Sequence, residues 1–238
     1  MQFIVELCSV PIEVHHHYPQ IRNLCTDYLA VPDTLPAFSV SVTDTELEAE
    51  MAITEGCFSR GACESTCLHR AIVQRMVSYG VILIHAAVVA VDGVAYAFLA
   101  KSGVGKSTHI QLWQKAFGER AVIINGDKPF FSFEGDRLMV HGSPWRGKEG
   151  LGANLSAPIG GICFLERGTA NVITSATPAE VVGRLFHQVL IPHDREEQTA
   201  FMATLDRILR EIPLYRLACN MDIEAARVAY AGMKLPTC

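Results

Sequence analysis

A glycine-rich segment near the middle of the chain has the residue types that bind phosphate groups. It reads Ala100-Lys101-Ser102-Gly103-Val104-Gly105-Lys106-Ser107-Thr108, close to the phosphate-loop pattern G-x-x-x-x-G-K-[ST]. Glycines let consecutive backbone N–H groups turn toward an anion, and a following helix adds the positive end of its dipole. The lysine adds a point charge, and the serine hydroxyl is a magnesium ligand. We therefore expect Ser102, Gly103, Val104, Gly105, Lys106, Ser107 and Thr108 to bind the phosphates of ATP.

The first glycine of the pattern is replaced by Ala100, and alanine resists the positive φ angles that glycine adopts. The context is nevertheless the required one, because an apolar run precedes the loop and an amphipathic pattern follows it. The alternative is a glycine-containing turn that binds nothing. At the start of the following helix, we expect Lys106 to be exposed to solvent.

A magnesium ion bound with the nucleotide needs a second oxygen ligand from the protein. The apolar run Val122-Ile123-Ile124 leads into Asn125-Gly126-Asp127, and an acidic residue directly after a buried strand fits a Walker-B role. We predict that Ser107 and Asp127 bind Mg²⁺ and that Asp127 also orients or deprotonates the acceptor. The alternative is a strand-terminal turn, since Asn, Gly and Asp all favour turns.

Two further segments could complete a catalytic site. His85 lies within the apolar run 81–91, and histidine is a frequent acid–base group. Arg146 and Lys148 lie in the glycine-rich segment 142–150, which could bring positive charge to a transferring phosphoryl group. The structural alternatives are a strand histidine without a catalytic role and a solvated basic turn.

Hydrophobic periodicity predicts the elements that position these residues. Asp92-Gly93 between two apolar runs predicts a hairpin, so the strand at 94–99 should pair antiparallel with the one at 81–91. A second hairpin is expected at 130–140. Further strands are expected at 121–124, 161–165 and 214–219, and helices at 68–79, 107–117, 177–190, 195–211 and 222–232.

The first 62 residues differ from the rest of the chain. They hold short strand patterns at 3–5, 12–14 and 38–42, a short helix pattern at 21–29 and an acidic stretch. We interpret residues 1–62 as a small N-terminal α+β lobe and residues 63–238 as a phosphate-loop domain of the α/β class with a mixed sheet.

Composition narrows the possible partners. The net charge of -5 over 238 residues gives no general attraction for nucleic acid or anionic membranes, so neither is expected as a partner. No apolar run approaches the 18 residues typical of a membrane helix, and no signal peptide is evident. The eight cysteines form no C-x-x-C pair, so we expect reduced thiols in a cytoplasmic protein.

Together these residues resemble the HPr kinase/phosphorylase family and its relatives with a phosphoenolpyruvate carboxykinase type of phosphate loop. The resemblance covers about residues 81–232. It is carried by the His85 strand, the Asp92-Gly93 hairpin, the loop 102–107, Gly126-Asp127 and Arg146-Gly147. The hairpin directly before the loop is the specific point, because Ras-like and RecA-like proteins reach their loops from a parallel sheet without it.

The resemblance implies the mixed-sheet fold of that family and an ATP-dependent kinase acting on a serine or similar hydroxyl of a peptide, small protein or metabolite. It also suggests a homo-oligomer. In the family an Asp-Asp pair binds metal and supplies the base, whereas this chain has Gly126-Asp127. The family's Arg-Gly element matches Arg146-Gly147, so Arg146 is expected to neutralise charge in the transition state.

The departures from the family leave the acceptor open. HPr kinases carry a different, larger N-terminal domain, and their loop usually continues Lys-Ser-Glu where this chain has Lys106-Ser107-Thr108. The chain is more similar to the short HPr-kinase-like proteins of bacteria, some of which phosphorylate peptides. Two alternatives remain at this stage: a nucleotide-binding regulatory protein with little turnover, and a carboxykinase-type lyase.

Overall fold

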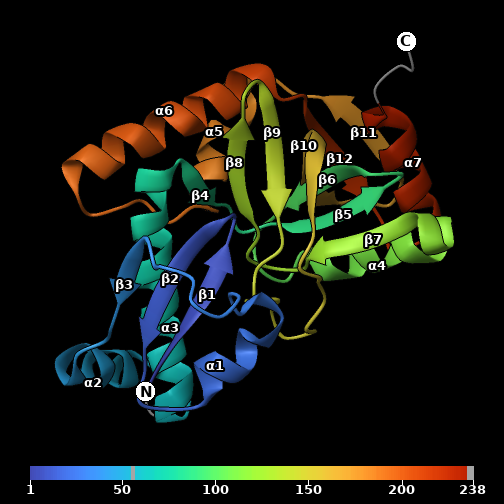
Figure 1. The fold of residues 1–238 in the computed structure, drawn as a ribbon. Coiled ribbons are helices and arrows are strands. Elements are labelled where there is room, and N and C mark those ends of the chain that lie inside the picture. Colours follow the sequence, from blue (N-terminus) through green and yellow to red (C-terminus); the bar gives the residue numbers. More distant parts are fainter. Residues whose placement is uncertain (55–56, 235–238) are drawn as a thin grey trace.

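The computed structural model describes residues 1–54 and 57–234. Its N-terminal part is a three-stranded sheet in the order β1-β2-β3, with bounds Gln2–Leu7, Val10–His15 and Phe38–Val40. Helices α1 (Gln20–Leu24), α2 (Asp44–Ile53) and α3 (Arg60–Met76) lie beside this sheet (Figure 1). The strands and the short first helix follow the predicted pattern, whereas α2 was not predicted, because few of its residues are buried.

Helix α3 joins this N-terminal sheet to the rest of the chain. Ser59 caps its first turn, and Leu68, Ile72 and Met76 are buried at the spacing of one helix face. A 3₁₀ turn, Val77–Tyr79, follows α3, and Gly80 ends it in the left-handed conformation, as the sequence indicates. Because α3 begins at Arg60, it runs through the predicted division at residue 62, and the division into two domains stays a prediction.

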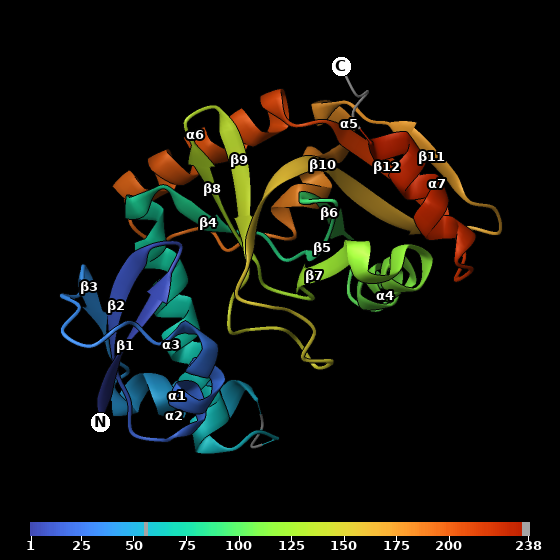
Figure 2. The ribbon, with the colours of Figure 1, turned by 45° about the vertical axis from the view of Figure 1, so that its right-hand side comes forward.

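The larger sheet has nine strands and is mixed and curled. Its main order is β4-β8-β9-β10-β6-β5-β7, and β12 pairs with both β10 and β11. The long strand β10 (Ser156–Arg167) pairs antiparallel with β9 through its first residues and parallel with β6 and β12 through the rest. This change of partners along one strand accompanies the curl of the sheet seen in Figure 2.

Helices cover both faces of this sheet. On one face, α5 (Pro178–Phe186) and α6 (Arg195–Glu211) bury Leu185, Phe201 and Leu205 against it. On the other face, α4 (Lys106–Phe117) and α7 (Glu224–Met233) bury Trp113 and a row of alanines. Burial on both faces explains why the central strands read as continuous apolar runs. Within the described residues, no helix combines the length and apolar character needed to cross a membrane.

Four strands end at the same edge of the sheet. β6 (Val94–Leu99) runs parallel to β10, and β10 runs parallel to β12 (Leu214–Cys219). The strands β6 and β7 (Ala121–Asn125) share a direction, because each pairs antiparallel with the intervening β5 (Ala87–Val91). Ligands in α/β sheets bind outside the carboxyl ends of strands, so this edge is the place to look for a site.

The Asp92-Gly93 hairpin is confirmed. Both turn residues have positive φ, 52° and 81°, as a two-residue hairpin turn requires, and β5 pairs antiparallel with β6. The hairpin of β8 (Phe130–Glu134) and β9 (Arg137–His141) is confirmed as well. Strand β11 (Val172–Ser175) was not predicted, since it is short and largely exposed.

The prediction of one continuous strand over 81–91 is wrong. The run forms two strands, β4 (Val81–Leu83) and β5, and His85 lies between them. The reason is that β4 pairs with β8 whereas β5 pairs with β6 and β7, so the chain crosses from one part of the curled sheet to another. An apolar run buried throughout carries no sequence mark of such a crossing.

The cysteines that the structure describes, Cys8, Cys25, Cys57, Cys63, Cys67, Cys163 and Cys219, are free thiols. The eighth, Cys238, lies outside the described residues.

Candidate active site

The segment 100–105, called the phosphate loop below after its sequence pattern, joins β6 to α4, as that pattern requires. Gly103 and Gly105 have φ angles of 79° and 119°, which a side chain would strain, and Gly105 stands at the start of α4. Ala100 is not among the residues with positive φ. Alanine therefore fits the first position of the loop, and the departure from the pattern there costs no backbone strain.

The side chain of Lys106 is buried, with 8% of the residue exposed. Its Nζ donates a hydrogen bond of 3.0 Å to the carbonyl oxygen of Ala100. The expectation that Lys106 is exposed is wrong, because the side chain folds back over its own loop instead of extending into solvent. Burial lowers its pKa, which the nearby carboxylate of Asp127 partly offsets.

The turn after β7 is built around the buried amide of Asn125. Its Oδ1 accepts hydrogen bonds of 2.8 Å from the backbone N–H groups of Asp127 and Lys128. Its Nδ2 donates to the carbonyl and hydroxyl oxygens of Ser143, both at 3.1 Å. The segment is thus a turn, as its composition suggested, and this turn holds Asp127 at the wall of a cleft shared with the phosphate loop.

The carboxylate of Asp127 is held by two basic side chains. His85 Nε2 lies 2.7 Å from Oδ1, and Lys128 Nζ contacts Oδ2. Burial by itself would raise the pKa of Asp127, but the hydrogen bonds from His85 and Lys128 and the Lys128 charge hold it well below its usual range. Asp127 is therefore ionised at neutral pH, which suits a metal ligand.

The backbone of the loop 142–155 lies against this turn. A Cβ at Gly126 would stand 3.2 Å from the Leu151 carbonyl oxygen and 3.3 Å from that of Arg146. A Cβ at Gly147, where φ is 74°, would stand 2.9 Å from the Cβ of Asp127. Both positions favour glycine, and a second aspartate at Gly126 would require the loop to shift.

A different carboxylate reaches the phosphate loop. Glu149 Oε2 lies 3.5 Å from Ser107 Oγ, and both residues line the same cleft as Asp127. Hydroxyl and carboxylate oxygens are the ligands that Mg²⁺ prefers, so the donor set of Ser107, Asp127 and Glu149 fits that ion. Glu149 is therefore a second carboxylate in the same cleft, close to the Ser107 hydroxyl.

Arg146 is turned toward the N-terminal sheet. Its guanidinium donates to Asp27 Oδ2 at 2.7 Å and lies 5.8 Å from the ring centre of Tyr28, while Nε is buried without a partner among the described residues. The backbone carbonyl of Asp27 also accepts 2.7 Å from Asn154 Nδ2. The N-terminal part of the chain thereby anchors the loop that lies between it and α4 in Figure 2.

The phosphate loop, the turn after β7 and residues 145–149 line one cleft with a volume of about 850 Å³. The phosphate loop, Asp127 and His85 line it together with Trp145 and residues from the N-terminal part. Its charged and titratable side chains are His85, Lys106, Lys128, Arg146, Lys148, Asp127 and Glu149. Because basic groups outnumber the two carboxylates, the cleft suits an anionic ligand.

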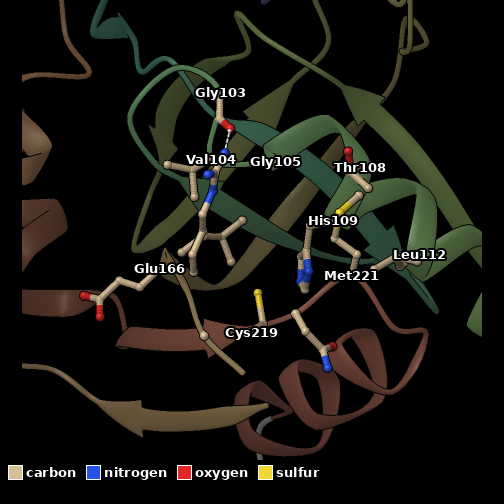
Figure 3. Close-up of a pocket in the computed structure, with 13 residues that line it drawn as sticks. Gly103, Val104, Gly105, Thr108, His109, Leu112, Glu166, Cys219 and Met221 are labelled. Carbon is tan, nitrogen blue, oxygen red and sulfur yellow. Dashed lines mark hydrogen bonds between the residues drawn. The ribbon is translucent and has the colours of Figure 1, made fainter. Parts of the chain in front are cut away.

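A second pocket, about 580 Å³ in volume, also borders the phosphate loop (Figure 3). It shares Gly103, Gly105 and Thr108 with the cleft, so the two spaces adjoin. Val104 lines this pocket and not the cleft. Arg167, at the end of β10, donates 2.7 Å to the Gly103 carbonyl and ties the loop to that strand.

The structure thus brings His85, Lys106, Ser107 and Asp127 to one cleft, and places Arg146 at its edge, engaged with Asp27. Sequence reasoning gave no role to Asn125, Lys128 or Arg167. Lys128 and Asn125 flank the predicted Asp127 and could have been considered with it. Arg167 stands at the carboxyl end of a predicted strand, a position that often faces a ligand.

No family model and no curated protein matches this chain in sequence. Among solved structures, its fold is similar to that of the Hpr(Ser) kinase/phosphatase from Coxiella burnetii, with 8% sequence identity and a TM-score of 0.37. The match covers 64% of this chain and 99% of that one. It is a weak resemblance at the level of the fold.

The Asp127 contacts predict how stability depends on pH. Its pKa is lowered in the folded state, so its contribution is fully present above the unfolded value of about 3.9 and is lost as pH falls through the lower folded value. The free energy of unfolding should therefore fall below about pH 4 in the wild type, and less steeply in Asp127→Asn. Urea titrations from pH 3 to 7 measure this, with the exposed Asp33→Asn as control. Equal acid slopes in all three proteins would contradict the ion-pair assignment.

Proposed function

We propose that this chain is an ATP-dependent phosphotransferase that moves the γ-phosphoryl group of ATP to a hydroxyl group. The observation that carries the proposal is that Lys106, Ser107 and Asp127 line one cleft, with His85 and Lys128 on the Asp127 carboxylate. Phosphoryl transfer is catalysed almost entirely by positioning and electrostatic stabilisation, and these groups supply both.

Each group has a distinct role in this proposal. The loop N–H groups, the start of α4 and Lys106 bind the phosphates. Ser107, Asp127 and Glu149 would hold Mg²⁺, which would supply neutralisation of charge on the phosphate oxygens. Asp127 accepts a hydrogen bond from the acceptor hydroxyl and takes its proton as the new P–O bond forms. The bond between the γ-phosphorus and the β–γ bridging oxygen breaks at the same time, and ADP leaves with that oxygen. His85 is a positioning residue, since it touches Asp127 at 2.7 Å.

The acceptor enters from the side of the N-terminal part. Leu24, Phe58, Thr66 and Trp145 line the same cleft as the phosphate loop, and Leu24 and Phe58 are exposed. This mostly apolar wall suits a hydroxyl carried by a peptide, a small protein or a metabolite with an apolar portion. A cytoplasmic location and a homo-oligomeric state are part of the same proposal.

One observation favours a second candidate, a nucleotide-binding regulatory protein with little turnover. Both oxygens of Asp127 are already engaged by His85 and Lys128. Incubation with γ-labelled ATP, Mg²⁺ and mixed serine peptides or hydroxyl metabolites separates the two. Label in an acceptor supports the transferase. Binding of ATP without transfer or phosphate release supports the regulator, and no binding at all rejects both.

Lys106→Met tests nucleotide binding. The methionine keeps most of the buried aliphatic stem but removes the charge, so ATP affinity should fall by about tenfold or more and transfer should be lost. Calorimetric titration measures the affinity. The exposed Lys115→Met on the same helix is the control, and circular dichroism checks that both variants fold. Unchanged ATP affinity in Lys106→Met would reject the phosphate-loop assignment.

Asp127→Asn tests the chemical step. Asparagine keeps the shape of the side chain but removes its charge and basicity, so transfer should fall by about two to four orders of magnitude. ATP should still bind through the loop, with a weaker dependence on Mg²⁺. Single-turnover kinetics with γ-labelled ATP measure the transfer. Near-normal turnover would show that Asp127 is only a turn residue and would direct attention to Glu149.

Arg146 and Asp27 should be coupled in catalysis. If the guanidinium neutralises charge in the transition state, Arg146→Lys should lower kcat far more than it raises KM for ATP, since lysine loses the planar fork. Asp27→Asn should lower kcat through the same arginine, with partial rescue in Asp27→Glu. The double variant should be no worse than Arg146→Lys alone. Additive losses would mean that Asp27 does not act through Arg146.

A further inference from the structure

The pocket beyond the phosphate loop has no part in the transfer chemistry described above. Its volume is about 580 Å³, and its apolar lining comes from Val104, Leu112, Leu165 and Met221, with Cys219 beside them. It lies at the carboxyl ends of β10 and β12, against the first turns of α4. Because it adjoins the phosphate cleft at Gly103, Gly105 and Thr108, one extended ligand can occupy both.

His109 gives this pocket one specific hydrogen-bond donor. The residue is only 3% exposed, and its Nε2 lies 3.1 Å from the indole Nε1 of Trp113. An indole N–H only donates, so Nε2 must accept, and a neutral imidazole then carries its proton on Nδ1. Burial lowers the pKa of His109 to about 4, so the ring is neutral at pH 7.

The Nδ1–H group of His109 is buried and has no hydrogen-bond partner in the part of the chain that the structure describes. Figure 3 shows the imidazole pointing from α4 toward the segment that carries Cys219 and Met221. A buried donor without a partner is costly, and here it belongs to a residue that lines an apolar pocket. A ligand with an acceptor atom at that point would satisfy it.

The charged and amide side chains of the pocket are already engaged. Glu166 is held by Arg184 at 2.5 Å and by Arg216 at 3.1 Å. The Asn220 amide donates to the Asp222 carboxylate and accepts from the backbone N–H of Asp222. Arg167 donates to the Gly103 carbonyl. Among the described side chains that line the pocket, the carboxylate is therefore engaged, and the Nδ1–H group of His109 is a buried donor without a partner.

These features select among flat, apolar ligands. Adenine presents ring nitrogens that accept hydrogen bonds, and its faces suit apolar side chains. Guanine presents the same acceptor nitrogens at positions 3 and 7. It also carries an N–H group at position 1, where adenine has an acceptor, and this group needs an acceptor such as a carboxylate, whereas Glu166 is taken by two arginines. The donor and the lining thus match adenine better than guanine.

We propose that this pocket binds the adenine ring of the nucleotide, with His109 Nδ1–H donating to one of its ring nitrogens. The inference rests on the proposed function, because the triphosphate of the same molecule would lie on the phosphate loop. The ribose would cross the residues that both spaces share, Gly105 and Thr108.

A neighbouring pocket of about 450 Å³ supplies the internal control. It borders Ala100, Lys101 and Val104 but neither Gly105 nor Thr108. Gln188 lines it, is equally buried, and has a side-chain oxygen without a partner among the described residues. Gln188→Leu therefore removes a comparable buried polar group from a pocket next to the same loop.

The first experiment uses the unaltered protein and calorimetric titration with ATP, GTP and inorganic tripolyphosphate. ATP should bind about tenfold or more tightly than either of the other two. Three ATP analogues, in which ring nitrogen 1, 3 or 7 is replaced by CH, locate the hydrogen bond. One of them should lose about tenfold in affinity, while the other two bind like ATP. Equal affinities for ATP and all three analogues would overturn the inference.

The second experiment compares variants. His109→Leu should bring ATP affinity close to that of tripolyphosphate, whereas His109→Asn, whose amide N–H stands near the position of Nδ1, should keep part of the preference for ATP. Gln188→Leu should keep all of it. Loss of the preference in Gln188→Leu would place the base in the neighbouring pocket and overturn the inference. The analogue series keeps the test valid if the His109 variants do not fold.

Failure of the adenine site and failure of the proposed function give different results in these experiments. If tripolyphosphate binds and ATP binds no more tightly, the adenine site is wrong and the phosphate loop stands. If neither binds, the proposed function itself is wrong, and the adenine site is rejected with it.

Discussion

The buried amide of Asn125 holds together the two segments on which the candidate site depends. Through Oδ1 it fixes the backbone of Asp127 and Lys128, and through Nδ2 it binds Ser143. It thus joins the end of β7 to the loop that follows β9. That loop carries Arg146 and Glu149, so one side chain sets where both the carboxylates and the arginine stand. A buried amide of this kind is costly unless every bond is made, which makes the arrangement specific.

The N-terminal sheet contributes to this site as much as the large sheet does. Asp27 holds Arg146, and Leu24 and Phe58 line the cleft together with the phosphate loop. The core of the N-terminal part is also continuous with Val81, Leu83 and Phe130 of the larger sheet. The cleft is therefore a property of the whole chain, and the phosphate loop alone would not complete it.

Local signals in the sequence predicted much of the fold. The Asp92-Gly93 hairpin, α6 and β12 depend on turn chemistry, capping and periodicity, which neighbouring residues encode. The misses depend on contacts that hydrophobic periodicity does not encode. His85 lies at a break because two halves of one apolar run pair with different strands. Lys106 is buried because its ammonium folds back onto the Ala100 carbonyl six residues earlier. Spacing along the chain does not contain these contacts.

In this structure, most of the basic groups of the cleft have a partner within the protein. Lys106 binds the Ala100 carbonyl, Lys128 and His85 bind Asp127, and Arg146 binds Asp27. A triphosphate would draw Lys106 and Lys128 away from their present partners rather than meet bare charges, so its binding free energy would be a difference between two sets of contacts. A divalent ion at Asp127 would compete directly with Lys128 for the same oxygen. Displacing Lys128 would free a cation beside the phosphate loop, so metal and nucleotide should favour each other's binding through this one carboxylate.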